Sequence, residues 1–393
     1  MTSAIRHMLI VLGLLFAVPL ALLAALFRHI TRRSTRPSRS LWITQPIPTI
    51  PLLADAERSI GFTVQTWAFE VNRLEQRFDR NLSNARYTHF LGPLSPFLNL
   101  ILACLSCDRL HFFCDRGLLP LFRAREFNPV ELLLYRISRK QLFFWAYGAD
   151  VRTRNATLAL GSPNCCEACP HPGKYCICDD TRAAINQRRI AHAATARFSI
   201  GDMTHYTPGS NNTLFYWPID LNDPRYAPAI PDANPERPLR ILHAPNHRHF
   251  KGTDHLIAAV ENLRTRGLSV ELQLVENLTH DQALAQYRNA DVIFDQCLIG
   301  FHGYFALEAM ALAKPVLCFI RNPQRDLLAP DACPIINIRP ETIEREIERL
   351  CLERELLPQL GSLGRTYIET YYSLSACSQR LALALSHTGA SLP

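Results

Sequence analysis

The sequence predicts an α/β protein with two domains, each built on a parallel sheet, behind an apolar N-terminal segment. The 393 residues give room for two domains and appendages. From residue 240 onward, short apolar strands alternate with amphipathic helices, which is typical of a doubly wound parallel sheet. Between the two halves, residues 218–238 contain six prolines, a composition that favours an interdomain linker.

Composition places the chain among folded globular proteins. Hydrophobic residues make up 48% and charged residues 20%, which is unlike a disordered chain. The 13 cysteines are odd in number, and several lie inside apolar runs. Mostly free, buried thiols in a reducing compartment are therefore expected.

The net charge of +7 is concentrated near the N-terminus. Arg6 precedes the first apolar segment, and five arginines follow it closely. Those five are Arg28, Arg32, Arg33, Arg36 and Arg39. The remainder of the chain is nearly neutral, which argues against nucleic acid as its partner.

Residues 8–27 form an uncharged run of 20 residues, long enough to cross a bilayer core of about 30 Å. A cleaved signal peptide is the alternative, but its apolar region is usually shorter and lacks a following arginine cluster. With residues 1–39 as anchor and basic flank, the positive-inside rule places the rest of the chain in the cytoplasm. The expectation is a single-pass protein of the inner (cytoplasmic) membrane.

Residues 40–217 are predicted to form the first α/β domain. Expected helices and strands alternate along it, at 53–60, 62–67, 93–106, 109–114, 141–147, 181–195, 196–201 and 214–217. The apolar stretch 93–106 is expected to be a core helix, with a membrane-contact helix as the alternative. Gly148, Asp150 and Arg152 follow the strand 141–147, where open α/β sheets bind ligands. They are candidates for the acceptor side, and a salt-bridged loop pair is the alternative reading of Asp150 and Arg152.

A cysteine-rich loop, 163–180, lies within this first domain. Four of its cysteines have spacings that could close a tetrahedral zinc site: Cys166, Cys169, Cys176 and Cys178. Free or disulfide-prone thiols are the alternative. A catalytic metal with an open position is not indicated.

Residues 239–363 are predicted to form the second domain. Its strands are expected at 240–243, 270–275, 291–294, 316–319 and 335–338. Thr253 is expected to cap the helix that ends before Gly267, and Thr279 with Gln282 matches a capping box. A closing helix is expected over 364–387.

Two loops of the second domain carry the parts needed to hold a nucleotide diphosphate. One supplies Arg248 and Lys251-Gly252, and the other supplies Gly303, where backbone can approach a ligand closely. A helix starting near Tyr304 aims free N–H groups at an anion, and Glu308 lies one turn further. The sequence contains neither a P-loop nor a Gly-x-Gly-x-x-Gly motif.

These residues resemble the GT-B glycosyltransferases, specifically the large retaining bacterial group (glycosyl transferases group 1). The resemblance is strongest over 243–319 and extends more weakly over 41–385. The motifs that carry it are Lys251-Gly252, Ala290-Asp291-Val292, Gly303, Leu307-Glu308-Ala309-Met310-Ala311, Lys314-Pro315-Val316 and the stretch from Gly364-Arg365 to Tyr372-Ser373. The resemblance implies two Rossmann-like domains facing a cleft, with Lys251 on the donor diphosphate and Glu308 on the donor ribose.

Two positions depart from the family pattern. The acid that contacts the donor sugar, eight residues before the ribose-binding Glu, is here Gly300. The family's Arg, five residues before the Lys, is here Asn246, with Arg248 as the nearest replacement. Asp295 and Gln296 stand just upstream and are candidates for the missing polar contacts, with a strand-end residue that caps a turn as the alternative reading of Asp295.

The resulting hypothesis is a metal-independent glycosyltransferase at the cytoplasmic membrane face. It would transfer a sugar from a nucleotide-diphosphate sugar to a glycan or lipid-linked acceptor, with retention. Lys251, Arg248 and the helix N-terminus would stabilise the departing diphosphate, and domain closure would bring donor and acceptor together. A non-catalytic GT-B-like scaffold protein of glycan assembly and a sugar-nucleotide epimerase are the alternatives.

Overall fold

The computed structural model of the chain describes residues 38–71, 75, 77–84, 92–119 and 126–386, with a few positions between 13 and 23. Most of the apolar segment 8–27 and most of its arginine flank fall outside these residues. Within the described part of the chain, no helix has the length and apolarity needed to cross a membrane. The predicted anchor therefore stays a prediction.

The chain divides into two compact units. The first unit combines the chain up to Thr153 with Tyr175–Leu214 and the end from Ser378, and the second combines Arg154–Lys174 with Phe215–Cys377. Two assignments differ from the sequence-based boundaries. Residues 163–174 of the cysteine-rich loop, and all of the proline-rich 218–238 segment, pack with the second unit.

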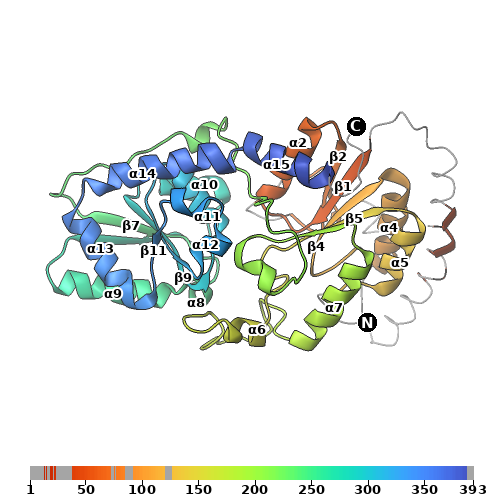
Figure 1. Ribbon diagram of the computed structural model, residues 1–393, viewed down its shortest axis with the longest axis horizontal. Helices are drawn as coiled ribbons and strands as arrows, with labels where there is room; N and C mark the ends of the chain where they lie inside the picture. Colours follow the sequence, from red (N-terminus) through yellow and green to blue (C-terminus); the bar gives the residue numbers. More distant parts are fainter. Residues whose placement is uncertain are drawn as a thin grey trace. The chain divides into compact units, whose positions relative to one another are not determined.

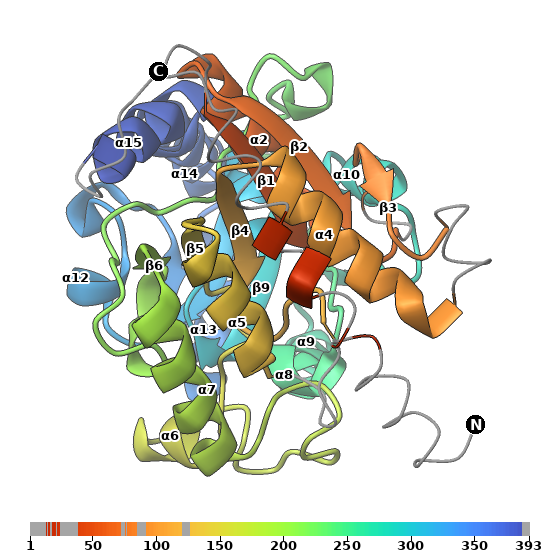
Figure 2. The same cartoon turned by 90° about the vertical axis from the view of Figure 1, so that its right-hand side faces the viewer.

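The first unit is built on a six-stranded parallel sheet, with strand order β3-β2-β1-β4-β5-β6 (Figure 1). Its strands are β1 (Arg39–Thr44), β2 (Thr63–Ala68), β3 (Arg80–Asn81), β4 (Arg109–Phe113), β5 (Gln141–Trp145) and β6 (Ala196–Phe198). Its helices are α2 (Thr49–Ser59), α4 (Ser95–Ser106), α5 (Pro129–Ile137) and α7 (Asp180–Ala193). Figure 2 shows α4, α5 and α7 on one face of this sheet.

Sequence signals explain where these helices begin. Asn128 caps α5 by accepting from the amide of Val130, with Pro129 in the first turn where its missing N–H costs nothing. Asp179 caps α7 through the amide of Arg182. The central strands β4 and β5 are almost wholly buried, as expected for strands covered on both faces.

A buried polar cluster ties three strands and a helix of the first unit together. Glu57 on α2 accepts hydrogen bonds from Ser40 (2.8 Å) and Trp42 (3.0 Å), and His111 Nε2 lies 3.4 Å from the same carboxylate. Trp145 donates to His111 Nδ1 at 3.2 Å. Because every member is buried and partnered, the cluster belongs to the core and not to a ligand site.

The second unit carries a five-stranded parallel sheet in the order β11-β10-β9-β7-β8. Its strands are β7 (Leu239–His243), β8 (Val270–Leu274), β9 (Val292–Gly300), β10 (Val316–Ile320) and β11 (Ile336–Asn337). Its helices are α6 (Arg154–Ala159), α8 (Arg248–Lys251), α9 (Thr253–Thr265), α10 (His280–Tyr287), α11 (Tyr304–Ala311), α12 (Pro323–Asp326), α13 (Ile343–Leu352) and α14 (Leu356–Tyr367). Helix α15 (Leu374–Ser386) follows.

Helices cover both faces of this second sheet. In Figure 1, α9 and α13 lie on one face, and α10, α11 and α14 lie on the other. The chain leaves β7 for β8 on one side and returns to β9 on the other side of β7. The switch in direction between β7 and β9 is the place where open α/β sheets bind ligands.

Three local predictions are wrong. Residues 214–217 are not a strand, and Phe215 instead has a positive φ of 46°. Thr253 does not cap α9, because its hydroxyl bonds the ring of buried His243 at 2.9 Å and Gly252 takes the cap position. The strand expected at 291–294 continues to Gly300.

The capping box of Thr279 and Gln282 at α10 is confirmed.

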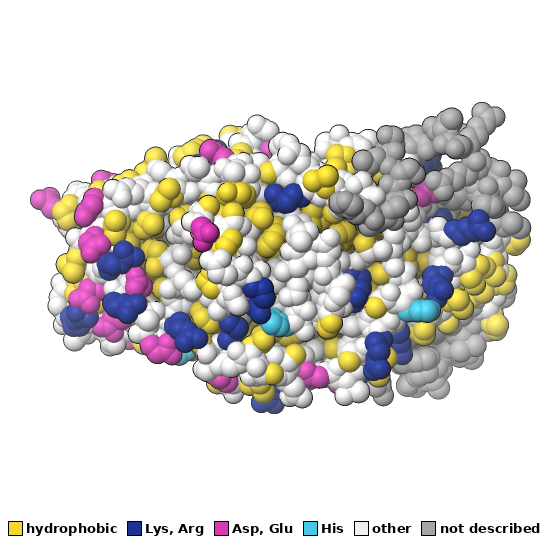
Figure 3. Space-filling model, viewed as in Figure 1, with side chains coloured by type: hydrophobic (Ala, Val, Ile, Leu, Met, Phe, Trp, Pro, Cys, Tyr) yellow, Lys and Arg dark blue, Asp and Glu magenta, His cyan; other side chains and the backbone are white. Residues whose placement is uncertain are grey.

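On the face shown in Figure 3, basic and acidic side chains are interspersed over the second unit. Several of them form ion pairs, such as Arg266 with Glu344 at 2.8 Å. This pattern agrees with the nearly neutral charge balance of the body of the chain.

Candidate functional site

The switch point of the second sheet is occupied by an ion pair. Lys251 ends the short helix α8 that follows β7, and Asp295 lies on the neighbouring strand β9. Lys251 Nζ lies 2.6 Å from Asp295 Oδ1. The amide of Gly303, at the start of α11, donates to the other carboxylate oxygen at 2.5 Å. One buried carboxylate therefore holds both the cation and the helix N-terminus that the sequence assigned to a phosphate.

The electrostatics of this pair favour its charged form. Burial alone would raise the pKa of Asp295, but Lys251 and the Gly303 amide outweigh it, and the pKa is lowered. The side chain of Lys251 remains 12% exposed while Asp295 is fully buried. The ammonium group is thus the member of the pair that a ligand can reach.

Two glycines are required by this geometry. A Cβ at Gly303 would lie 3.1 Å from Lys251 Nζ and 3.2 Å from Asp295 Oδ1. Gly252 adopts a left-handed conformation with φ 74°, and a Cβ there would lie 2.2 Å from Cys297 Sγ. Both glycines allow backbone to pass close to the switch point, as the sequence predicts for Gly303.

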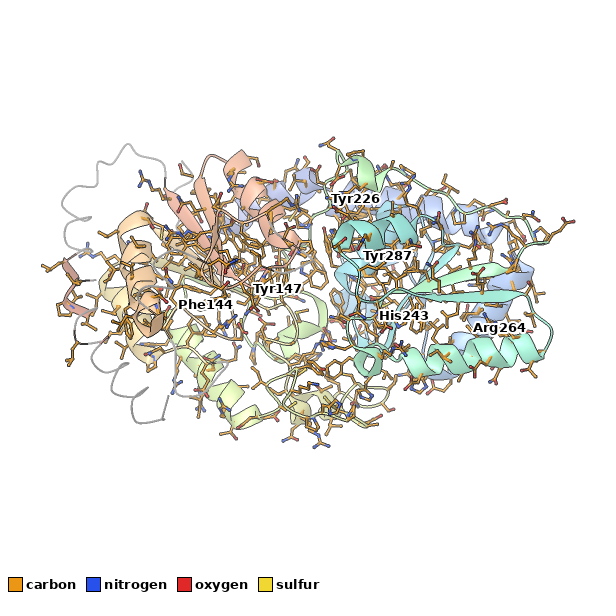
Figure 4. The ribbon with its side chains drawn as sticks, turned by 180° about the vertical axis from the view of Figure 1, so that it is seen from behind. Phe144, Tyr147, Tyr226, His243, Arg264 and Tyr287 are labelled. Atoms are coloured by element: carbon orange, nitrogen blue, oxygen red, sulfur yellow. The ribbon has the colours of Figure 1, made fainter. Side chains whose placement is uncertain are left out.

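Glu308 lies on the second turn of α11 and is 4% exposed. Its Oε1 accepts a hydrogen bond from the hydroxyl of Tyr226 at 2.8 Å and lies 2.5 Å from His280 Nε2. Burial works against the charged form of His280, but the carboxylate outweighs it and raises the pKa of the imidazole. Burial, followed by the Glu308 charge, raises the pKa of Tyr226. Figure 4 labels Tyr226, together with His243 of β7 and Tyr287 of α10, among the side chains of the second unit.

Three predicted donor-side residues have other partners in the structure. Arg248 is about half exposed and pairs with Glu276, its Nε 2.9 Å from Oε1, so its guanidinium is engaged by a carboxylate. Gln296 is fully buried and donates to the carbonyl of Phe319 at 2.6 Å, so its amide serves the core. The hydroxyl of Tyr304 donates to the Pro218 carbonyl at 2.9 Å.

Gly300 ends β9 beneath the guanidinium of Arg321. Its φ is 98°, and a Cβ there would lie 3.1 Å from Arg321 Nε. Arg321 donates to the carbonyls of Leu160, Gly161 and Pro163. The position of the family's sugar-binding acid is therefore adapted to glycine. Arg321, which follows β10, holds the 154–174 segment of the same unit through these carbonyls.

The acceptor-side candidates lie in the first unit but do not pair with each other. Asp150 accepts the amides of Tyr147, Gly148 and Cys114, and burial, helped by Asp115, raises its pKa to about 7. Arg152 forms a bidentate pair with Asp202 at 2.7 and 2.8 Å. The alternative reading, a salt-bridged pair of Asp150 and Arg152, is wrong, since each side chain binds other partners.

The four cysteines of the predicted zinc site are split between the two units. Cys166 and Cys169 belong to the second unit, and Cys176 and Cys178 belong to the first. Cys166 packs in the hydrophobic core of the second unit. In the described ranges, no group of three or more His, Cys, Asp or Glu side chains is placed to hold a metal ion. The structure gives the zinc hypothesis no support.

Sequence reasoning missed Tyr226 and His280, which both bind Glu308 in the structure. Tyr226 lies in the proline-rich segment taken for a linker. His280 is the first residue of a helix whose capping box was recognised. A polar residue at a helix start that is buried by tertiary packing has no local sequence signal.

Comparisons with known proteins agree on the fold. No protein-family model matches the sequence, and no curated protein matches it. The structure is similar to sucrose-phosphate synthase from Thermosynechococcus elongatus, with TM-score 0.61 and 12% identity over 90% of this chain and 100% of that chain. It is also similar to WaaG, a glycosyltransferase involved in lipopolysaccharide biosynthesis, with TM-score 0.53 and 14% identity over 89% and 100% of the two chains.

A third similar structure is that of OtsA, with TM-score 0.52 and 10% identity over 91% of this chain and all of that one. At these identities the likeness concerns the fold. Each of these relatives is covered over its whole length, so the similarity includes both units. The chain therefore has the GT-B fold.

Proposed function

We propose that this protein is a glycosyltransferase that uses a nucleotide-diphosphate sugar as donor. The observation that carries the proposal is the arrangement at the switch point of the second sheet. Lys251 ends α8 after strand β7, and Glu308 lies on α11, whose N-terminus follows the neighbouring strand β9. They supply a cation, backbone donors and a carboxylate, which match a diphosphate and a hydroxyl-rich sugar or ribose.

In the proposed reaction, Lys251 and the α11 N-terminus stabilise negative charge on the departing diphosphate. Because Asp295 holds both groups in place, little rearrangement is needed when the diphosphate arrives. The acceptor hydroxyl attacks the anomeric carbon on the face that the diphosphate leaves, so the linkage is retained. We propose that these protein groups do this without a metal ion.

The acceptor and the membrane location remain parts of the proposal. A glycan or a lipid-linked acceptor fits an enzyme whose apolar segment 8–27 anchors it to the cytoplasmic face of the inner membrane. Among proteins of similar structure, WaaG is described as acting in lipopolysaccharide biosynthesis. Removal of residues 1–39 is expected to release the protein from the membrane fraction of disrupted cells.

A non-catalytic sugar-nucleotide-binding protein is a second candidate, favoured by one observation. Gly300 stands where the family has an acid, and Arg321 lies so close that no longer side chain fits without displacement. Such a protein would bind nucleotide sugars and leave them intact.

One experiment separates these candidates. The full chain in detergent is titrated by calorimetry with a panel of nucleoside diphosphates and nucleotide sugars, and donor hydrolysis is followed with and without EDTA. An enzyme is expected to bind one nucleotide, to hydrolyse its sugar slowly in EDTA, and to lose both properties on Lys251→Ala. Binding without turnover supports the second candidate, and no binding to any nucleotide contradicts both.

A further inference from the structure

Glu308 is held by two donors that converge on one of its two oxygens. Tyr226 comes from a one-turn helix, Pro224–Tyr226, in the proline-rich segment, and His280 is the first residue of α10. Both contacts end on Oε1, at 2.8 Å and 2.5 Å. Within the described residues no hydrogen bond to Oε2 occurs. The two oxygens of Glu308 therefore have different roles.

The charged groups around His280 leave it directed at Glu308. Arg225 bonds Asp223 through Nε at 2.8 Å and also pairs with Asp281, so its guanidinium is engaged beside the cluster. Tyr287 presents its ring to Phe305, with ring centroids 4.7 Å apart. The neighbouring charges are thus satisfied among themselves, and they do not compete for the Glu308 carboxylate.

Hydrogen bonds that hold one oxygen of a buried carboxylate also set the orientation of its other oxygen. A glutamate side chain that rotates freely loses conformational entropy when a ligand orders it, and this loss weakens binding. Here Tyr226 and His280 have already ordered it, because each binds Oε1 from a different element. Oε2 is then presented in one orientation, as a positioned acceptor for a hydroxyl group.

We propose that Tyr226 and His280 are positioning residues that aim Oε2 of Glu308 at a ribose hydroxyl of the donor. This inference rests on the proposed function, and it adds the residues that set the preference for ribonucleotides. The site therefore selects a ribonucleoside diphosphate over its 2′- or 3′-deoxy counterpart. A deoxynucleotide leaves the buried Glu308 carboxylate without a hydroxyl donor, so the deoxynucleotide binds more weakly than the ribonucleotide.

The test compares ribose and deoxyribose binding in variants of the full chain. Calorimetry measures the dissociation constants of UDP, ADP and GDP and of their 2′-deoxy and 3′-deoxy forms. We expect the wild-type protein to prefer one ribonucleotide over its deoxy form by about tenfold or more, the value of one hydrogen bond to a charged group. Tyr226→Phe and His280→Ala are each expected to reduce that preference severalfold. His280→Gln, whose amide can still donate, is expected to restore part of it.

Tyr287→Phe is the matched control, because it removes from the same helix as His280 a hydroxyl that senses the charge of Glu308 but, among the described residues, does not hydrogen-bond it. It is expected to keep the ribose preference of the wild type. A purely structural role for Tyr226 and His280 predicts lower melting temperatures with an unchanged preference, and that result overturns the inference while leaving the proposed function intact. Failure of the wild-type chain to bind any nucleotide overturns both.

Discussion

Lys251 and Asp295 form an ion pair across the switch point of the second sheet, with Nζ 2.6 Å from Oδ1. Lys251 ends the helix that follows β7 and Asp295 lies within β9, and the same carboxylate receives the amide that precedes α11. The pair therefore couples the two loops that carry the proposed donor site. Its strength determines how rigid that site is before a nucleotide binds.

Lys251→Met and Asp295→Asn are each expected to destabilise the protein by about 3 kcal/mol, because each leaves a largely buried partner without its counter-charge. The double variant is expected to cost clearly less than the sum of the two. Denaturant unfolding of the four proteins measures this coupling. Arg248 and Glu276, an exposed pair, form the control cycle, with an expected coupling below about 1 kcal/mol. Additive effects at Lys251 and Asp295 would show that the pair is not coupled.

Gly300→Ala is expected to cost about 2 kcal/mol or more, because a φ of 98° strains any other residue and the new Cβ meets Arg321. Gly173→Ala is the control for backbone strain alone, since Gly173 has φ 81° and open space around its Cβ position. Comparison of unfolding midpoints separates strain from crowding. Gly300→Glu, which restores the family acid, is expected to lower stability further and not to raise transfer activity. Higher activity in that variant would contradict this account of the position.

Gly252→Ala is expected to be among the most damaging single changes in the second unit, at about 3 kcal/mol or more, since the methyl group would meet Cys297 Sγ at 2.2 Å. The change Cys297→Ala removes that sulfur. In the Gly252→Ala background it is expected to recover part of the lost stability, although alone it leaves a small cavity. Thermal unfolding of the two single variants and the double variant checks this. No recovery in the double variant would mean that the left-handed backbone at Gly252, and not the contact, sets the cost.

Lys314 is a buried cation whose pKa burial lowers to about 8. Within the described part of the chain, its ammonium group makes no hydrogen bond, while its backbone amide donates to the Ala309 carbonyl at 2.9 Å. A folded-state pKa below the unfolded value of 10.5 means that the charged form is penalised only in the folded state. The penalty is complete below about pH 8, shrinks as pH rises from 8 toward 10.5, and disappears above that.

Lys314→Met is therefore expected to stabilise the protein at pH 7 by about 2 kcal/mol, with a smaller gain at pH 9.5. Lys140 is the contrasting case, because its buried ammonium donates to the carbonyls of Cys104 and Cys107 at 2.6 and 2.7 Å. Lys140→Met is expected to destabilise at both pH values. Free energies of unfolding at the two pH values test both expectations, and a gain from Lys314→Met that does not change with pH would contradict the explanation by charge burial.

The elements of the second unit were predictable because their signals are local. The capping box of Thr279 and Gln282, the glycine before Tyr304 and the apolar strands each lie within a few residues of the feature they specify. The same signals failed at 214–217, where Phe215 has a φ of 46° and the backbone is not extended. Thr253 shows a different limit, since its hydroxyl serves buried His243 in place of the helix cap.

The sequence by itself determined the α/β class, the two-domain plan and the positions of Lys251, Gly303 and Glu308 on strand-end loops. Only the tertiary structure decided what those residues contact. Tyr226 reaches Glu308 across 82 residues and His280 across 28, and Arg321 covers Gly300 because β10 lies beside β9. Strand order sets these contacts, and it depends on how all the apolar faces pack together, a property that no short window of sequence contains.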